Sequence, residues 1–108
     1  MFIKLAAQSE LPGINEAKEF PCGEKIVCVA NVDGEINAMD NICLHRGGPL
    51  GHGTIEGGKV ICPWHGWAWD PKTGASGPMG DKIAVYSVKI EGEDLLIDIR
   101  SLTVRGSD

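Results

Sequence analysis

Four residues of this sequence could bind a metal ion or cluster as a set. They form two short motifs, Cys43-x-His45 and Cys62-x-x-His65, with sixteen residues between His45 and Cys62. Each motif offers one thiolate and one imidazole, donors that suit an iron–sulfur cluster, zinc or copper better than cations that prefer oxygen. Glycine and proline flank both motifs, and they let the backbone approach a cluster closely and point its N–H groups at the sulfurs. The motifs therefore predict a metal centre.

A structural zinc site is an alternative for the same donors, because cysteine and histidine are the usual ligands of structural zinc. One residue separates Cys43 from His45, which is shorter than the spacing of roughly two to four residues typical of zinc knuckles. The spacing favours an iron–sulfur cluster and leaves zinc as the less favoured possibility.

The motifs and their surroundings resemble the Rieske family, whose signature is Cys-x-His followed after a similar spacer by Cys-x-x-His. Residues 43–48, 62–67 and 70–74 read CLHRGG, CPWHGW and DPKTG, and the strand-rich blocks around them also fit. The resemblance implies one Rieske-type [2Fe–2S] cluster. It places Cys43 and Cys62 on one iron, and His45 and His65 on the other.

The resemblance also indicates a low-potential member of that family. High-potential members carry an extra cysteine in each ligand loop, and a Ser and a Tyr near the second motif donate hydrogen bonds to sulfur. Here Trp64 stands at the place of the second extra cysteine, Trp67 follows the second motif, and the only tyrosine is the distant Tyr86. Fewer donors stabilise the reduced cluster less, so we expect a potential of about −150 mV, at the low end of the Rieske range.

Two blocks rich in β-branched residues must position these motifs. Asp33-Gly34 predicts a type I′ turn between two strands of the first block, and a short helix is conceivable within residues 6–15. The intervening residues 40–81 hold all three histidines, all three tryptophans and most of the glycines. Strands are predicted over residues 2–6, 25–32, 35–39, 83–90 and 95–99, with a polar tail over residues 101–108.

The chain length of 108 residues suits a single domain. We therefore expect one all-β Rieske domain over residues 1–108, with residues 40–81 as its cluster-binding subdomain. The expected architecture is the Rieske iron–sulfur fold, an antiparallel β-sandwich with the smaller subdomain inserted between strands.

The net charge of −5 argues against a nucleic-acid partner, because binding phosphate needs a basic face. No apolar run approaches the roughly 20 residues that span a bilayer, and the first residues lack the pattern of a secretory signal. We expect no membrane partner and a cytoplasmic location.

Several side chains outside the ligand set carry expectations of their own. Cys28 is expected to be a buried thiol, Cys22 receives no role, and a disulfide between them is disfavoured in a reducing compartment. His52 is expected on the surface. Three further expectations concern apolar residues. Trp67 and Trp69 pack under the cluster loops, and Trp64 is exposed and contacts a partner. An apolar rim around the exposed histidines is formed by Pro49, Leu50, Pro78 and Met79.

These observations predict an electron carrier rather than an enzyme. A Rieske oxygenase needs a second, mononuclear iron site built from two histidines and a carboxylate, and His52 is the only histidine left over. We expect the protein to carry single electrons from a reductase to a terminal oxygenase or reductase that docks near His45, Trp64 and His65. A small Rieske subunit of a nitrite reductase-like enzyme is the alternative.

Overall fold

The computed structural model describes residues 2–22, 25–41, 49–64, 66–76 and 82–103, with side chains described as far as Asp98. Within these ranges the protein is all-β, as predicted, with two short 3-10 turns, η1 (Gln8–Glu10) and η2 (Leu50–His52), and no α-helix. All strand pairs are antiparallel and belong to one sheet in the order β1-β9-β8-β4-β3-β2-β5-β6-β7. The strands are β1 (Ile3–Ala7), β2 (Glu16–Cys22), β3 (Lys25–Val32), β4 (Glu35–Asp40), β5 (Thr54–Glu56), β6 (Lys59–Ile61), β7 (Ala68–Trp69), β8 (Val85–Glu91) and β9 (Asp94–Thr103).

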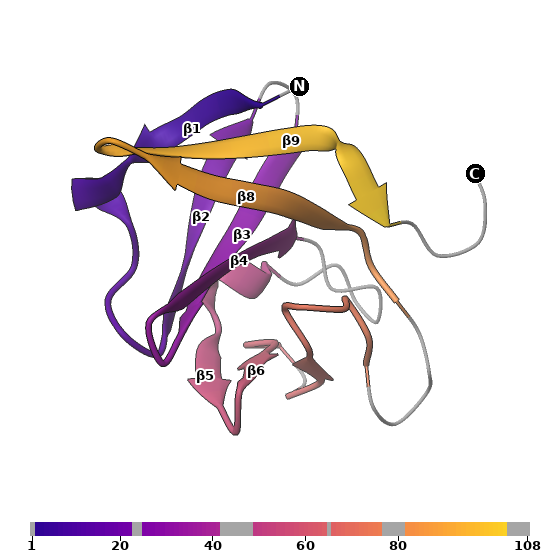
Figure 1. Cartoon of the computed structure of the whole chain (residues 1–108). Coiled ribbons are helices and arrows are strands. Elements are labelled where there is room, and N and C mark those ends of the chain that lie inside the picture. Colours follow the sequence, from indigo (N-terminus) through magenta and orange to yellow (C-terminus); the bar gives the residue numbers. More distant parts are fainter. Residues whose placement is uncertain (1, 23–24, 42–48, 65, 77–81, 104–108) are drawn as a thin grey trace.

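The sheet folds over so that β1, β9 and β8 face β2, β3 and β4 as two layers (Figure 1). The space between the layers is filled by a first core to which both contribute. Its buried members are Ala6, Phe20, Cys22, Val27, Val29, Ala38, Ala84, Tyr86, Leu95 and Ile97. This arrangement confirms the predicted antiparallel sandwich.

A second core lies on the other face of β3 and β4, where β5 and β6 extend below the sandwich in Figure 1. Its buried members are Cys28, Ala30, Met39, Leu50, Val60, Cys62, Trp69 and Ile83. Successive side chains of a strand point to opposite faces, so Val27 and Val29 enter the first core while Cys28 and Ala30 enter the second. Burial on both faces explains why β3 reads as a continuous apolar run.

Most of the predicted strands are confirmed within one or two residues. Asp33 and Gly34 have φ angles of 53° and 95°, as the predicted type I′ turn requires. The possible helix within residues 6–15 is wrong beyond the short turn η1, and β9 continues through Thr103 into the expected polar tail. Strand β2 was not predicted, because Pro21 and three charged residues obscure its alternation.

The segment after β7 returns to the sandwich through a tight turn at Gly74. The N–H of Gly74 donates to the carbonyl of Asp70 at 2.7 Å, and the N–H of Ile83 donates to the carbonyl of Gly74 at 2.8 Å. Gly74 has a φ of +79°, and a Cβ atom there would collide with the carbonyl oxygen of Ile83. This turn therefore requires the glycine that ends the DPKTG motif.

Candidate metal centre

Cys62 is the one predicted ligand among the residues that the structure describes. It follows directly after β6, and only 2% of its surface is exposed at the edge of the second core. Cys43, His45 and His65 lie outside the described residues. The structure thus places one of the four donors and leaves the assembly of the set as a prediction.

Backbone hydrogen bonds close the chain around the second motif. The N–H of Cys62 donates to the carbonyl of Trp67 at 2.8 Å, and the N–H of Gly66 donates to the carbonyl of Cys62 at 3.0 Å. Gly66 has a φ of +75°, a left-handed conformation that glycine adopts without steric penalty. These two bonds hold the Cys62 backbone in place where β6 ends.

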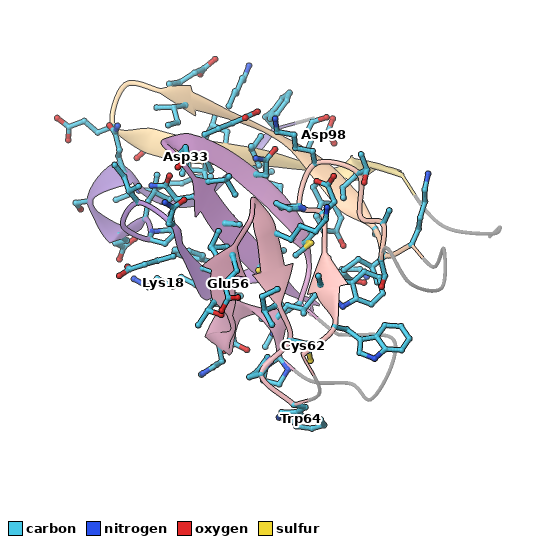
Figure 2. The ribbon with its side chains drawn as sticks, turned by 90° about the horizontal axis from the view of Figure 1, so that it is seen from below. Lys18, Asp33, Glu56, Cys62, Trp64 and Asp98 are labelled. Carbon is cyan, nitrogen blue, oxygen red and sulfur yellow. The ribbon has the colours of Figure 1, made fainter. Side chains whose placement is uncertain are left out.

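The tryptophans near this motif divide as predicted into one exposed and two packed side chains. Trp64 is 56% exposed, and Figure 2 shows it at the tip of the molecule beyond Cys62. Trp69 is fully buried in the second core and Trp67 packs against it, with ring centroids 6.2 Å apart and planes inclined by 28°. Trp69 and Trp67 thus pack in and against the second core, which also contains Cys62.

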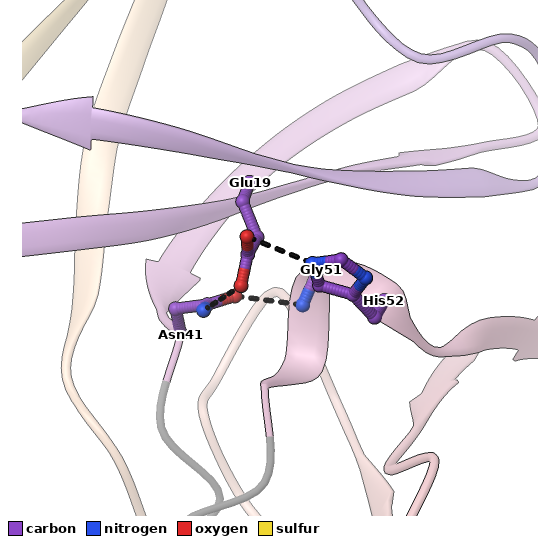
Figure 3. Close-up of polar contacts among 4 residues, drawn as sticks. All are labelled: Glu19, Asn41, Gly51 and His52. Carbon is purple, nitrogen blue, oxygen red and sulfur yellow. Dashed lines mark hydrogen bonds and ion pairs between the residues drawn. The ribbon is translucent and has the colours of Figure 1, made fainter.

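The residues that flank the first motif are tied to β2 by a polar network (Figure 3). Asn41 Nδ2 donates to Glu19 Oε2 at 2.6 Å, and the N–H of Gly51 donates to Asn41 Oδ1 at 2.7 Å. His52 Nε2 lies 2.9 Å from Glu19 Oε1. The hydrogen bond from Asn41 is the main cause that lowers the pKa of Glu19 below its usual value; burial opposes it, and His52 adds to the lowering.

Sequence reasoning missed Glu19 and Asn41, because 22 residues separate them and neither belongs to a motif. His52 is exposed as predicted, although its contact with Glu19 was not foreseen. The expected apolar rim is wrong for Leu50, which is fully buried in the second core. Turn η2 directs Leu50 inward, and Pro78 and Met79 lie outside the described residues.

The remaining two cysteines lie in different cores on opposite sides of the sheet. Cys22 belongs to the first core and Cys28 to the second, and neither forms a disulfide. Burial raises the pKa of the Cys28 thiol to about 12, with a smaller contribution from the negative charge of Glu19. Cys28 is therefore a neutral core residue, as predicted.

Cys62, the described member of the predicted ligand set, is suited to bind a metal cluster. A thiol buried at the edge of an apolar core becomes an acceptable thiolate when it binds a metal, because an isolated buried charge is costly. Among the residues that the structure describes, which include only one of the four predicted ligands, no group of three or more His, Cys, Asp or Glu side chains could hold a metal ion. No helix in the described part of the chain is long and apolar enough to cross a membrane.

The all-β fold, with Cys62 buried directly after β6, suits a small metal-cluster protein, and comparison with known proteins gives its family. The model of the Rieske [2Fe-2S] domain matches residues 1–87. The ferredoxin component of the naphthalene 1,2-dioxygenase system of Pseudomonas aeruginosa is 38% identical over 77 residues, which cover 69% of this chain and 74% of that protein. The chain belongs to the Rieske [2Fe–2S] domain family.

Solved structures agree with this assignment. The ferredoxin of Sphingomonas yanoikuyae B1 superposes with a TM-score of 0.80 at 31% identity, covering 91% of this chain and 98% of that one. A chain from the complex of reduced oxygenase and oxidized ferredoxin in carbazole 1,9a-dioxygenase superposes with a TM-score of 0.72 at 25% identity, covering 89% and 91%. This protein is thus an electron carrier with one Rieske-type [2Fe–2S] cluster, and is not itself a catalytic oxygenase.

Proposed function

We propose that Cys43, His45, Cys62 and His65 hold the cluster, within a single domain over residues 1–108 whose cluster-binding subdomain spans residues 40–81. The observation that carries the proposal is the position of Cys62, buried where β6 ends and next in the chain to an exposed apolar tip. The family match over residues 1–87 includes both motifs. When bound, the cluster supplies one-electron redox chemistry at a potential raised by its two histidine ligands.

We further propose that the protein carries single electrons from a reductase to a terminal oxygenase. Its relative from Pseudomonas aeruginosa is the ferredoxin component of a dioxygenase system, and a carbazole dioxygenase ferredoxin has been seen in complex with its oxygenase. In this chain the second core packs behind Cys62 and excludes water from that side. Electrons would therefore leave on the opposite, solvent-facing side.

The proposed docking surface surrounds His45, Trp64 and His65. Trp64 supports it, because tryptophan is one of the residue types enriched among the side chains that carry most of the binding energy of protein interfaces, and this one is 56% exposed. A small contact around this side chain suits a transient complex that forms and separates with each electron.

The first experiment is EPR spectroscopy of the dithionite-reduced protein, with iron and acid-labile sulfide counted on the same sample. We expect a rhombic signal with an average g below that of an all-cysteine cluster, and about two irons and two sulfides per chain. Replacing His45 or His65 by alanine should abolish that signal. A redox-silent protein containing zinc would overturn the proposal.

The docking surface is tested with Trp64→Ala, and Ile14→Ala provides a matched control. Ile14 is 69% exposed, and its neighbour Asn15 bonds to Asn31 at one end of β3, whereas Asn41 bonds to Ile26 at the other. These positions on β3 are about 17 Å apart, and Figure 2 likewise shows Asp33 well away from Trp64.

The acceptor in this test is the purified oxygenase component of naphthalene 1,2-dioxygenase, and electron transfer is followed by stopped-flow absorbance. We expect Trp64→Ala to lower the second-order rate constant about fivefold or more, with its EPR signal intact. Ile14→Ala should transfer electrons at the wild-type rate. Equal rates for both variants and the wild type would contradict docking at Trp64.

We also propose a cytoplasmic location. Cys22 and Cys28 are both present as thiols on opposite sides of the sheet, and proteins of oxidising compartments tend to use their cysteines in disulfides. Cell fractionation with the tagged protein tests the proposal, and recovery in a periplasmic or extracellular fraction would contradict it.

A further inference from the structure

The polar network around Glu19 joins three parts of the chain that are far apart in sequence. Glu19 lies on β2, Asn41 follows β4, and Gly51 and His52 belong to turn η2. Asn41 and η2 stand on either side of the first ligand motif, which contains Cys43 and His45. The network therefore ties both ends of the segment that carries the first two ligands to one strand of the sandwich.

Asn41 is the centre of this network. Only 2% of its surface is exposed, and its side chain donates to Glu19 and accepts from the N–H of Gly51. Its backbone carbonyl also accepts from the N–H of Leu50 at 2.7 Å. A buried amide with both of its polar ends bonded holds one orientation, because turning it would break both hydrogen bonds.

The packing around Gly51 leaves little freedom for this arrangement to shift. A Cβ atom on Gly51 would lie 2.7 Å from the backbone nitrogen of Glu19 and 2.9 Å from Asn41 Oδ1. Turn η2 thus touches the backbone of β2 directly. Glu19 shares the face of β2 on which Ala17 packs against the second core, the core that also contains Cys62.

We propose that Glu19 is a positioning residue for the cluster: through Asn41, it sets the distance between the two ends of the first ligand-bearing segment and fixes that segment against the core that holds Cys62. The inference rests on the proposed ligands Cys43 and His45. The negative charge of Glu19 makes the bond from Asn41 charge-assisted, and such bonds are about twice as strong as neutral ones. His52 is an outer support, because its side chain is 65% exposed while that of Glu19 is 28% exposed.

The test compares Glu19→Ala with Glu16→Ala in the cluster-loaded protein. Both changes remove one carboxylate from β2, so their effects on net charge are equal. Glu16 lies on the opposite face of the strand, and its carboxylate accepts a bond from the nearby N–H of Gly13 at 3.1 Å. Glu19→Gln keeps an acceptor for Asn41 and serves as the conservative variant.

Three measurements are made on each variant: the rate of cluster loss from the visible absorbance, the reduction potential, and the g values of the reduced protein. We expect Glu19→Ala to lose its cluster about tenfold faster or more and to show altered g values. Glu16→Ala should match the wild type in the rate of cluster loss and in the g values. Glu19→Gln should give values between those of the wild type and those of Glu19→Ala. A merely structural role would change the rate of loss without changing the g values or the potential.

A double variant separates a shared pathway from independent effects. If Glu19 acts through Asn41, the double variant that combines Glu19→Ala and Asn41→Ala should lose its cluster no faster than the single variant Asn41→Ala. The inference would be overturned if the two substitutions multiplied each other's effect on the rate of cluster loss. It would also be overturned if Glu19→Ala had the same g values and reduction potential as Glu16→Ala. A wild-type protein without a Rieske signal would instead refute the proposed function, so the two failures are distinguishable.

Discussion

The burial of Leu50 predicts that removing its side chain destabilises the protein. Leu50 is fully buried among Met39, Val60, Trp69 and Ile83 in the second core. Replacing a buried leucine by alanine costs roughly 2.7–5 kcal/mol, the lower values applying where neighbours relax into the cavity. Because η2 is a short surface turn that can adjust, we expect Leu50→Ala to destabilise the protein by about 3 kcal/mol.

The assay is urea unfolding of the cluster-loaded protein, followed by circular dichroism. With an m-value of about 2 kcal/mol per molar urea, the loss corresponds to a midpoint lower by about 1.5 M. Ile14→Ala, at a 69% exposed position, should shift the midpoint by less than about 0.3 M, as surface substitutions do. If Leu50→Ala also shifted the urea midpoint by less than about 0.3 M and slowed electron transfer to the oxygenase, the burial of Leu50 would be refuted. Leu50 would then belong to an exposed docking rim, as first expected.

Three further predictions concern titration and redox behaviour. Because burial raises the pKa of Cys28 to about 12, iodoacetamide near pH 8 should leave Cys28 unmodified in the folded protein and label it after unfolding, as mass spectrometry can show. The pKa of Glu19 is lower in the folded state than its usual value of 4.5, so its charge stabilises the fold above about pH 4.5 and this contribution is lost as the pH falls through the folded pKa. The difference in urea midpoint between wild type and Glu19→Gln should therefore shrink in acid; a difference that is constant from about pH 6 to pH 3 would contradict this. Voltammetry should give a reduction potential of about −150 mV, and a value above roughly +100 mV would contradict the low-potential assignment.

Short stretches of sequence were enough to predict the strands and turns that depend on neighbouring residues alone. The run of β-branched residues in β3 and the Asp33-Gly34 turn depend on neighbouring residues, and both are confirmed. The spacing of the two ligand motifs predicted the family, because cluster ligation restricts residue type and spacing together. Strand β2 was not predicted, because its stability depends mainly on pairing with the neighbouring strand β3 and not on a pattern in its own residues.

Tertiary structure decided what depends on contacts between distant residues. Leu50 looks like a loop residue beside Pro49, and only the packing of η2 against the second core buries it. Glu19 and Asn41 are ordinary polar residues in sequence, and their hydrogen bond exists only because β2 and the end of β4 come within hydrogen-bonding distance. The sequence by itself determined the family and predicted the ligands, because both depend on residue type and spacing. The fold decided the surroundings of Cys62 and Asn41, because burial and hydrogen bonding are properties of three-dimensional neighbours.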